Sequence, residues 1–343
     1  MSLATLEATA RALVAPGKGI LAADESHPTI ERRFKEHGIS NTEENRRRYR
    51  QMLFTTKGVG EFISGVILFD ETIRQAADDG RPLVEVLAGA RILPGIKVDG
   101  GAKPLAGAPG ERVTEGLDGL RERLAEYKTL GARFAKWRAV IAIGEDGRIP
   151  TRRALEANAD ALARYAALCQ EAEIVPIVEP EVLMDGGHSL ERCLEATETA
   201  LHAVFDALWE QRVAMEGLLL KPNMVLAGTT SPRQASVEEV AEATVRCLRR
   251  TVPVAVPGIV FLSGGQTDEL ATAHLNAMNR LPGPQPWSLS FSYGRALQAA
   301  PLRAWGGDPA RLADAQRAFH HRARCNSAAR SGAYTPELER SVA

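Results

Sequence analysis

Short apolar runs alternate with longer amphipathic segments along most of the chain. Each run has the length typical of a buried strand, and the segments between the runs carry apolar residues at helical spacing. We predict eight strands, at Gly19–Asp24, Gly65–Phe69, Gly95–Val98, Ala132–Arg138, Ile174–Glu179, Gly217–Lys221, Gly258–Ser263 and Ser288–Tyr293.

Several helix starts can be read from capping residues. Asn41 is followed three residues later by Glu44, and Ser236 by Glu239, the spacing of a capping box. Thr151 is a further cap, and Thr267 or Asp268 begins the helix after the seventh strand. Pro309 directly follows Asp308, the preferred order at a helix start.

Eight strands alternating with helices predict an α/β fold, the (β/α)₈ TIM barrel, as a single domain over residues 1–343 with a short C-terminal tail. A doubly wound sheet is the alternative. It is disfavoured because no G-x-G-x-x-G opens a helix after the first strand. No linker or shift in composition divides the chain.

Composition narrows the function. The chain is 45% hydrophobic and 25% charged, which is globular, and its net charge of −1 gives no general attraction for nucleic acid. No run approaches the ~20 apolar residues of a membrane span, and residues 1–14 lack the features of a signal peptide, so we expect a cytoplasmic protein without membrane or nucleic-acid partners. The four scattered cysteines suggest reduced, buried thiols, and the histidines show no metal-ligand spacing.

The basic segment 46–50 (RRRYR) is interpreted as a solvated helix face or a subunit contact, and the four tryptophans as packing residues.

Polar side chains stand where the predicted strands end, which is where TIM barrels carry their chemistry. Pro180 and Pro222 are expected to mark the change from strand to loop. The strand-end residues are Asp24, Lys97, Lys136, Arg138, Glu179, Glu181, Lys221, Ser263 and Arg295. A salt bridge at the rim explains any one charge, but a matched set of acids and bases predicts a catalytic cleft.

A lysine in such a cleft can condense with a carbonyl to give an iminium, an electron sink for carbon–carbon cleavage. One carboxylate would move protons during imine formation and a second would deprotonate the hydroxyl at the carbon that is cut. Two loops suggest phosphate binding, because "FLSGGQTDE" places Gly264 and Gly265 before a helix and "FSYGRALQ" supplies Gly294 and Arg295.

These motifs together resemble the class I fructose-1,6-bisphosphate aldolases of animals and plants. The matching segments run in order from about residue 17 to about residue 336 and include GKGILAADES, NTEENRR, GVILF, GIKVD, FAKWR, IVPIVEPE, LLKPNMV, FLSGGQ and FSYGRALQ. The resemblance implies reversible cleavage of fructose 1,6-bisphosphate to dihydroxyacetone phosphate and glyceraldehyde 3-phosphate, a glycolytic and gluconeogenic reaction. It implies phosphorylated sugar substrates, a homotetramer, and no cofactor or metal.

The resemblance also implies roles for single residues. Lys221 would form the Schiff base, Glu179 would be its acid/base with Glu181 beside it, Asp24 would deprotonate the C4 hydroxyl, and Lys136, with Arg138 nearby, would stabilise charge. Ser263, Gly264, Gly294 and Arg295 would hold the C1 phosphate, and Ser26, Arg33 and Lys97 would lie around the C6 phosphate. Arg138, Gly265 and Ser292 are further expected substrate-binding residues.

The chain also departs from the resemblance. It carries Arg32-Arg33 where a Lys-Arg pair is usual, and it ends in Ser341-Val342-Ala343 where the resembling enzymes have a longer tail ending in tyrosine. We therefore expect removal of the residues after Glu337 to leave cleavage nearly unchanged. Two other interpretations remain open. One is another lysine-dependent barrel, such as a transaldolase or a lyase for one phosphate, and the other is a non-catalytic scaffold.

Overall fold

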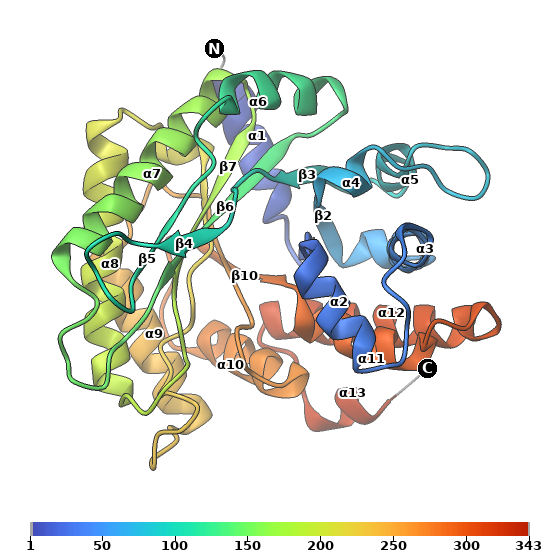
Figure 1. The fold of residues 1–343 in the computed structure, drawn as a ribbon. Coiled ribbons are helices and arrows are strands. Elements are labelled where there is room, and N and C mark those ends of the chain that lie inside the picture. Colours follow the sequence, from blue (N-terminus) through green and yellow to red (C-terminus); the bar gives the residue numbers. More distant parts are fainter. Residues whose placement is uncertain (1–2, 342–343) are drawn as a thin grey trace.

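The computed structural model describes residues 3–341, and its centre is a closed barrel of eight parallel strands (Figure 1). The order around the barrel is β1-β10-β9-β8-β7-β6-β3-β2. The strands are β1 (Gly19–Ala23), β2 (Ile63–Leu68), β3 (Leu93–Lys97), β6 (Phe134–Ile141), β7 (Val175–Val182), β8 (Leu219–Leu220), β9 (Gly258–Phe261) and β10 (Ser288–Tyr293). The predicted (β/α)₈ TIM barrel is confirmed. Val342 and Ala343, on which part of the tail prediction falls, lie outside the described residues.

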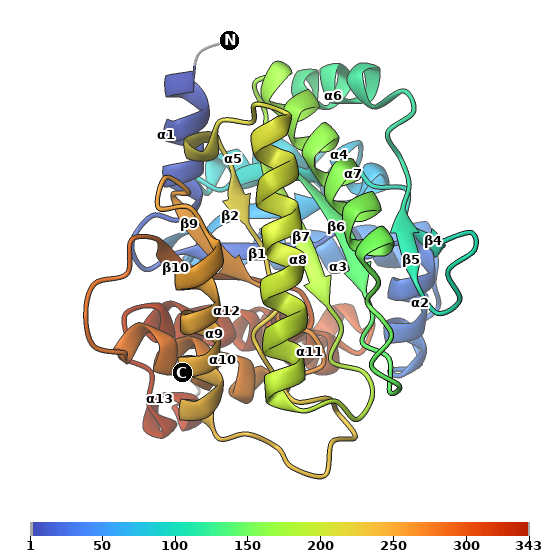
Figure 2. The same cartoon turned by 90° about the vertical axis from the view of Figure 1, so that its left-hand side faces the viewer.

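Helices surround the barrel, and Figure 2 shows α7 and α8 side by side over the strands that they follow or precede. The α-helices are α1 (Leu3–Leu13), α2 (His27–Lys35), α3 (Glu43–Phe54), α4 (Asp70–Ile73), α5 (Leu83–Gly89), α6 (Leu120–Thr129), α7 (Arg152–Glu171), α8 (Leu190–Glu210), α9 (Val237–Thr251), α10 (Asp268–Arg280), α11 (Arg295–Trp305), α12 (Leu312–Arg330) and α13 (Pro336–Arg340). Short 3₁₀ turns are η1 (Val59–Glu61), η2 (Met215–Gly217) and η3 (Pro309–Arg311).

The amino-terminal end of the barrel is closed by α1. Leu6 and Leu13 of this helix pack in one buried cluster with Phe134 and with residues of β1, β2, β7, β8 and β9. The Phe134 ring also explains the glycine in the middle of β3, because a Cβ on Gly95 would lie 2.3 Å from it. With this end filled by apolar side chains, polar chemistry is confined to the carboxyl ends of the strands.

One element was not expected from the sequence. Between β3 and β6 the chain forms a two-stranded antiparallel hairpin, β4 (Ala102–Pro104) and β5 (Arg112–Thr114). Each strand has only three residues and is mostly solvent-accessible, so no apolar run marks it. Thr114 connects the hairpin to the barrel, because its hydroxyl donates to the carbonyl oxygen of Arg138 at 2.7 Å.

Most predicted helix starts are confirmed. Ser236 and Glu239 form a capping box, and Thr151 and Thr267 cap α7 and α10. The predicted Asn41 cap is wrong by one residue, since the Thr42 hydroxyl accepts from the Asn45 amide at 3.1 Å. The side-chain oxygen of Asn41 instead accepts from the Arg46 guanidinium at 2.9 Å.

Pro180 does not end its strand, contrary to the prediction. β7 continues to Val182 and pairs with β6 along its whole length, with Glu181 opposite Val140. The extended backbone past Pro180 puts Glu179 and Glu181 on the same face of the strand. Pro222 lies beyond β8, which ends at Leu220, so the second proline does follow the strand.

The basic segment 46–50 is not a solvated face. Arg46 and Arg50 are one helical turn apart and both are buried, Arg50 completely. Arg46 forms an ion pair with Glu71 at 2.5 Å, and the Arg50 guanidinium lies 3.6 Å from Glu25 and 3.7 Å from Glu71. The solvated interpretation is therefore wrong for Arg46 and Arg50, because two acids distant in sequence neutralise their charges in the interior. Arg48 is exposed, and the subunit contact stays a prediction.

Three of the tryptophans pack in the core as expected, but Trp209 is 78% exposed, so the packing interpretation is wrong there. All four cysteines are buried free thiols, which confirms that prediction. Among residues 3–341 no helix combines the length and the apolar character that crossing a membrane requires.

Candidate active site

Lys221 is a buried lysine at the end of an apolar strand. The residue follows β8 and is only 4% exposed, and its amide donates to the carbonyl oxygen of Val178 on β7 at 2.8 Å. Its Nζ lies 3.0 Å from Oε1 of Glu179. A buried lysine is therefore held with its amine directed at a buried carboxylate from the neighbouring strand.

Glu179 is shared between two lysines. Its second oxygen lies 3.3 Å from Nζ of Lys136 on β6, and its carboxylate is 4% exposed. Lys136 in turn lies 2.6 Å from Asp24, which follows β1 across the barrel. The four side chains form one continuous row, Lys221–Glu179–Lys136–Asp24, in which two positive and two negative charges alternate.

The alternation fixes the charge state of this row. Burial alone would raise the pKa of Asp24, but the neighbouring Lys136 and Lys221 outweigh it and hold that pKa well below its usual range. Glu179 follows the same rule, since burial is outweighed by Lys136, Lys221 and Arg138, which lower its pKa. Burial would lower the pKa of Lys136, but Asp24 and Glu179 raise it. At neutral pH both acids are thus ionised bases and Lys136 is a fixed cation.

Arg138 and Glu181 form a second ion pair beside the row, on β6 and β7. The pairing register explains this, since Lys136 and Arg138 lie two residues apart on β6 and share a face, as do Glu179 and Glu181 on β7. Asp99 was missed by sequence reasoning. It follows β3, lies 3.3 Å from Nζ of Lys97, and accepts from the Arg138 amide at 3.2 Å. Its position shortly after a strand, in GIKVD, was the available signal.

The glycine loop after β9 lies against the start of α11. The Arg295 guanidinium donates to the carbonyl oxygen of Gly264 at 2.8 Å, which confirms that the two predicted loops meet. Gly264 adopts φ +55°, a conformation that favours glycine. The Gly265 amide is directed at Sδ of Met184, at 2.8 Å. Ser263 and Ser292 are both buried, and the Ser292 hydroxyl has no hydrogen-bond partner in the described part of the chain.

The three residues expected around the second phosphate are divided between two places. Arg33 pairs with Glu25, and its Nη2 would lie 3.7 Å from a Cβ on Gly294. The Ser26 hydroxyl contacts Thr29 at 3.2 Å at the start of α2. Lys97, the last residue of β3, pairs with Asp99, which also accepts from the Arg138 amide. Arg33 therefore also lies next to Gly294, in one of the loops expected to bind the C1 phosphate.

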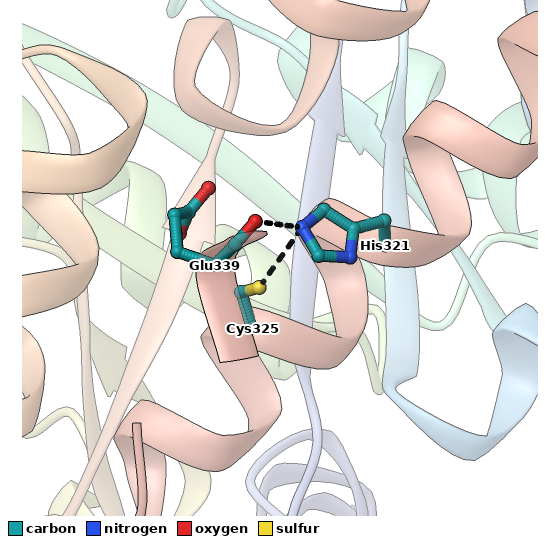
Figure 3. Close-up of side chains that lie close together, drawn as sticks. All are labelled: His321, Cys325 and Glu339. Carbon is teal, nitrogen blue, oxygen red and sulfur yellow. Dashed lines mark hydrogen bonds between the residues drawn. The ribbon is translucent and has the colours of Figure 1, made fainter. Parts of the chain in front are cut away.

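One cluster has side chains of the kinds that bind metals. His321 and Cys325 on α12 and Glu339 on α13 offer ligand atoms within 4.8 Å of one another (Figure 3). Their atoms are already engaged, since His321 Nε2 bonds the Glu339 carbonyl oxygen at 2.9 Å and the Glu339 carboxylate pairs with Arg322 and Tyr334. A cation there would face the buried Arg322 guanidinium, so the cluster is better explained as a contact between helices.

The site has the parts of a lysine-dependent carbon–carbon lyase. It has a buried amine next to a base, a second base across the mouth, and a fixed cation between them, which suits a barrel enzyme that acts on a carbonyl compound. No cofactor is required for the chemistry that these side chains can do.

Comparison with known proteins identifies the family. The sequence model of "Fructose-bisphosphate aldolase class-I" matches residues 5–343. A probable fructose-bisphosphate aldolase class 1 from Xanthomonas campestris pv. campestris is 61% identical over 97% of this chain and 99% of its own. The fructose-bisphosphate aldolase of Dictyostelium discoideum is 55% identical, over 97% and 93%.

The fold comparison agrees. A co-crystal structure of fructose-bisphosphate aldolase from Plasmodium falciparum, in complex with TRAP and a small-molecule inhibitor, superposes with a TM-score of 0.95 at 51% identity, over 97% of this chain and 95% of that one. The chain belongs to the class I fructose-bisphosphate aldolases. It is accordingly a lyase that cleaves fructose bisphosphate, as the motifs of the sequence had indicated.

Proposed function

We propose that Lys221 carries the reaction as a Schiff base with the C2 carbonyl of fructose 1,6-bisphosphate. The observation that supports this most is the 3.0 Å contact between its Nζ and the ionised Glu179. Glu179 takes a proton from the ammonium, which frees the amine to attack C2. The same carboxyl group then returns the proton to the carbinolamine hydroxyl, which leaves as water and gives the iminium.

Cleavage follows at the other end of the row. Asp24 removes the proton from the C4 hydroxyl, the C3–C4 bond breaks, and its electron pair passes to the iminium to give an enamine. Glyceraldehyde 3-phosphate leaves. Protonation at C3 and hydrolysis of the imine then release dihydroxyacetone phosphate and restore the Lys221 amine. Lys136, held between Asp24 and Glu179, keeps both acids ionised and stabilises negative charge that develops on the substrate.

The remaining predicted residues surround this row. Ser263, Gly264, Gly265, Ser292, Gly294 and Arg295 are proposed to hold the C1 phosphate, and Ser26, Arg33 and Lys97 to contact the C6 end. The link from Arg295 to Gly264 supports the first group, because it brings a guanidinium to a glycine loop before a helix. Glu181 and Arg138 would position Glu179 and Lys136 rather than react.

Trapping the imine tests the central step. We expect sodium borohydride added with dihydroxyacetone phosphate to label Lys221 alone, as located by peptide mass mapping. The variant Lys221→Met should take no label, whereas Lys97→Met, a lysine of the same mouth, should be labelled as fully as the native enzyme. An adduct on Lys97 or Lys136 with Lys221 unmodified would exclude the proposed role.

We further propose that residues 1–343 act as one catalytic domain with a short tail in a cytoplasmic homotetramer. Exposed Trp209 supports an interface, since its apolar side chain borders a groove of about 1120 Å³ formed where α8 and α9 end, and exposed Val254 adds apolar surface beside the lining residues Pro253 and Ala255. A sedimentation mass equal to one chain would contradict the tetramer. Buried free thiols suit a reducing compartment.

A further inference from the structure

The last short helix, α13, is attached to the rest of the protein by a buried ion pair. The Glu339 carboxylate pairs with the Arg322 guanidinium on α12, whose side chain is 4% exposed. The other Glu339 oxygen accepts from the Tyr334 hydroxyl at 2.7 Å, and the Glu339 carbonyl oxygen is the partner of His321 (Figure 3). Burial opposes the charged form of Glu339, but Tyr334 and Arg322 outweigh it and lower its pKa.

Arg322 carries this contact on to α10. Its Nη2 donates to the carbonyl oxygen of Asp268 at 3.1 Å and to the hydroxyl of Thr272 at 2.7 Å. These two residues form the first turn of α10, and Thr272 is completely buried. One guanidinium therefore connects α13 to the start of α10, and Figure 1 shows the two helices as neighbours.

The start of α10 in turn holds the glycine loop. Gln266 donates through Nε2 to the carbonyl oxygen of Ser263 at 3.1 Å, and its Oε1 lies 2.6 Å from Nδ1 of His274 on α10. Burial lowers the pKa of His274 to about 4, so this ring is neutral and its contact with Gln266 does not change near neutral pH. The loop 263–266 and the first two turns of α10 are thus one hydrogen-bonded unit.

From these three steps we infer that Glu339 is a positioning residue for phosphate binding, acting through Arg322 and α10 on the loop Ser263–Gln266. The inference rests on the proposed function, in which this loop holds the C1 phosphate. Glu339 is not among the residues proposed to contact substrate. Removing its charge leaves the buried Arg322 guanidinium hydrogen-bonded, in the described part of the chain, to neutral acceptors alone, with the Asp268 carboxylate as a nearby anion. Arg322 would then shift toward the carbonyl oxygens of α10 or toward water, and the loop would move with the helix. Removal of the residues after Glu337, which we expect to leave cleavage nearly unchanged, should on this inference raise KM while kcat stays nearly the same.

The test separates positioning from simple destabilisation. Mutations along a coupled element change affinity by about 2–30-fold, so Glu339→Ala should raise KM for fructose 1,6-bisphosphate by that factor while kcat per folded enzyme changes less than twofold. Glu339→Asp, which keeps the charge, should restore part of the affinity. The matched control is Glu337→Ala, because Glu337 is in the same helix but forms only an exposed pair with Arg340.

Each possible result either supports or overturns the inferred role of Glu339. An unchanged KM in Glu339→Ala, or a KM that rises equally in Glu337→Ala, overturns the inference, and so does a lower kcat and melting temperature with KM preserved. If Glu339→Ala does not fold, Glu339→Gln is judged by the same criteria. Failure of the proposed function would give different results from failure of this inference. In that case Arg295→Ala would also leave KM unchanged, and borohydride would not label Lys221.

Discussion

Replacing Lys136 by methionine removes the cation from the middle of the catalytic row. Lys136 lies 2.6 Å from Asp24 and 3.3 Å from Glu179, and its side chain is 5% exposed. Methionine keeps the volume and leaves two buried carboxylates with no cation between them. Breaking a buried ion pair in this way costs about 3–5 kcal/mol, and activity should fall by orders of magnitude because both acids lose the cation that contributes most to keeping them ionised.

The loss of folding stability can be measured as a fall in melting temperature. With an unfolding entropy of about 2.1 cal/mol/K per residue, 343 residues give about 0.7 kcal/mol/K, so Lys136→Met should melt about 4–7 °C lower at pH 7. Lys97→Met is the matched control. It removes one ion pair, at 3.3 Å to Asp99, from a side chain that is 17% exposed, and should lose less.

The pH dependence of this difference tests its cause. Asp24 and Glu179 have pKa values lowered in the folded protein from ordinary values of 3.8 and 4.5. Their stabilisation is therefore present above those values and is lost as pH falls toward the lowered folded values. The melting difference between native enzyme and Lys136→Met should be constant above about pH 5.5 and shrink between pH 5 and pH 3. A difference that is the same at pH 3 and pH 7, or no larger than that of Lys97→Met, would refute the electrostatic argument.

Two further predictions concern binding and metal ions. Arg295→Ala should raise KM for fructose 1,6-bisphosphate by about 10–100-fold, since a charge-assisted contact with phosphate contributes about 1.5–3 kcal/mol; an unchanged KM would place the C1 phosphate elsewhere. Because the proposed electron sink is an iminium on Lys221, activity should survive dialysis against EDTA. Loss of turnover that added zinc restores would show that a metal ion does the work assigned to the lysine.

The sequence predicted the barrel and most of its mouth for a simple physical reason. Strands buried on both faces need continuous apolar runs, so a charge at the end of such a run stands out. Lys221 and Asp24 were found in this way, and the structure brings them into one row through Lys136 and Glu179. The sequence could not show whether β7 continues beyond Pro180, because a proline can either end a strand or be accommodated within it.

What escaped prediction depends on contacts between distant segments. Arg50 looked like part of a solvated run because its partners, Glu25 and Glu71, are 25 and 21 positions away, and only the closed barrel brings them together. Asp99 was not singled out, because its role depends on contacts in the folded chain, where its carboxylate joins Lys97 to the Arg138 amide. The hairpin of β4 and β5 has too few apolar residues to leave a pattern.

The two proposed phosphate-binding arginines, Arg295 and Arg33, differ in the interactions that each must break in order to bind a phosphate. Arg295 donates to a neutral carbonyl oxygen of Gly264 and is otherwise exposed, so a phosphate at the glycine loop displaces only a weak acceptor. Arg33 pairs with Glu25, a carboxylate that is 4% exposed and also lies near the buried Arg50. A phosphate that recruits Arg33 must compete with an anion that is already in place. If the proposed assignments hold, the C1 end of the substrate would meet a preformed site, whereas at the C6 end Glu25 would weaken binding. The proposed imine at C2 would then form next to the phosphate that is held more firmly, which would keep the carbonyl aligned with Lys221 while the aldehyde half, bound less tightly, would be free to leave after C3–C4 cleavage.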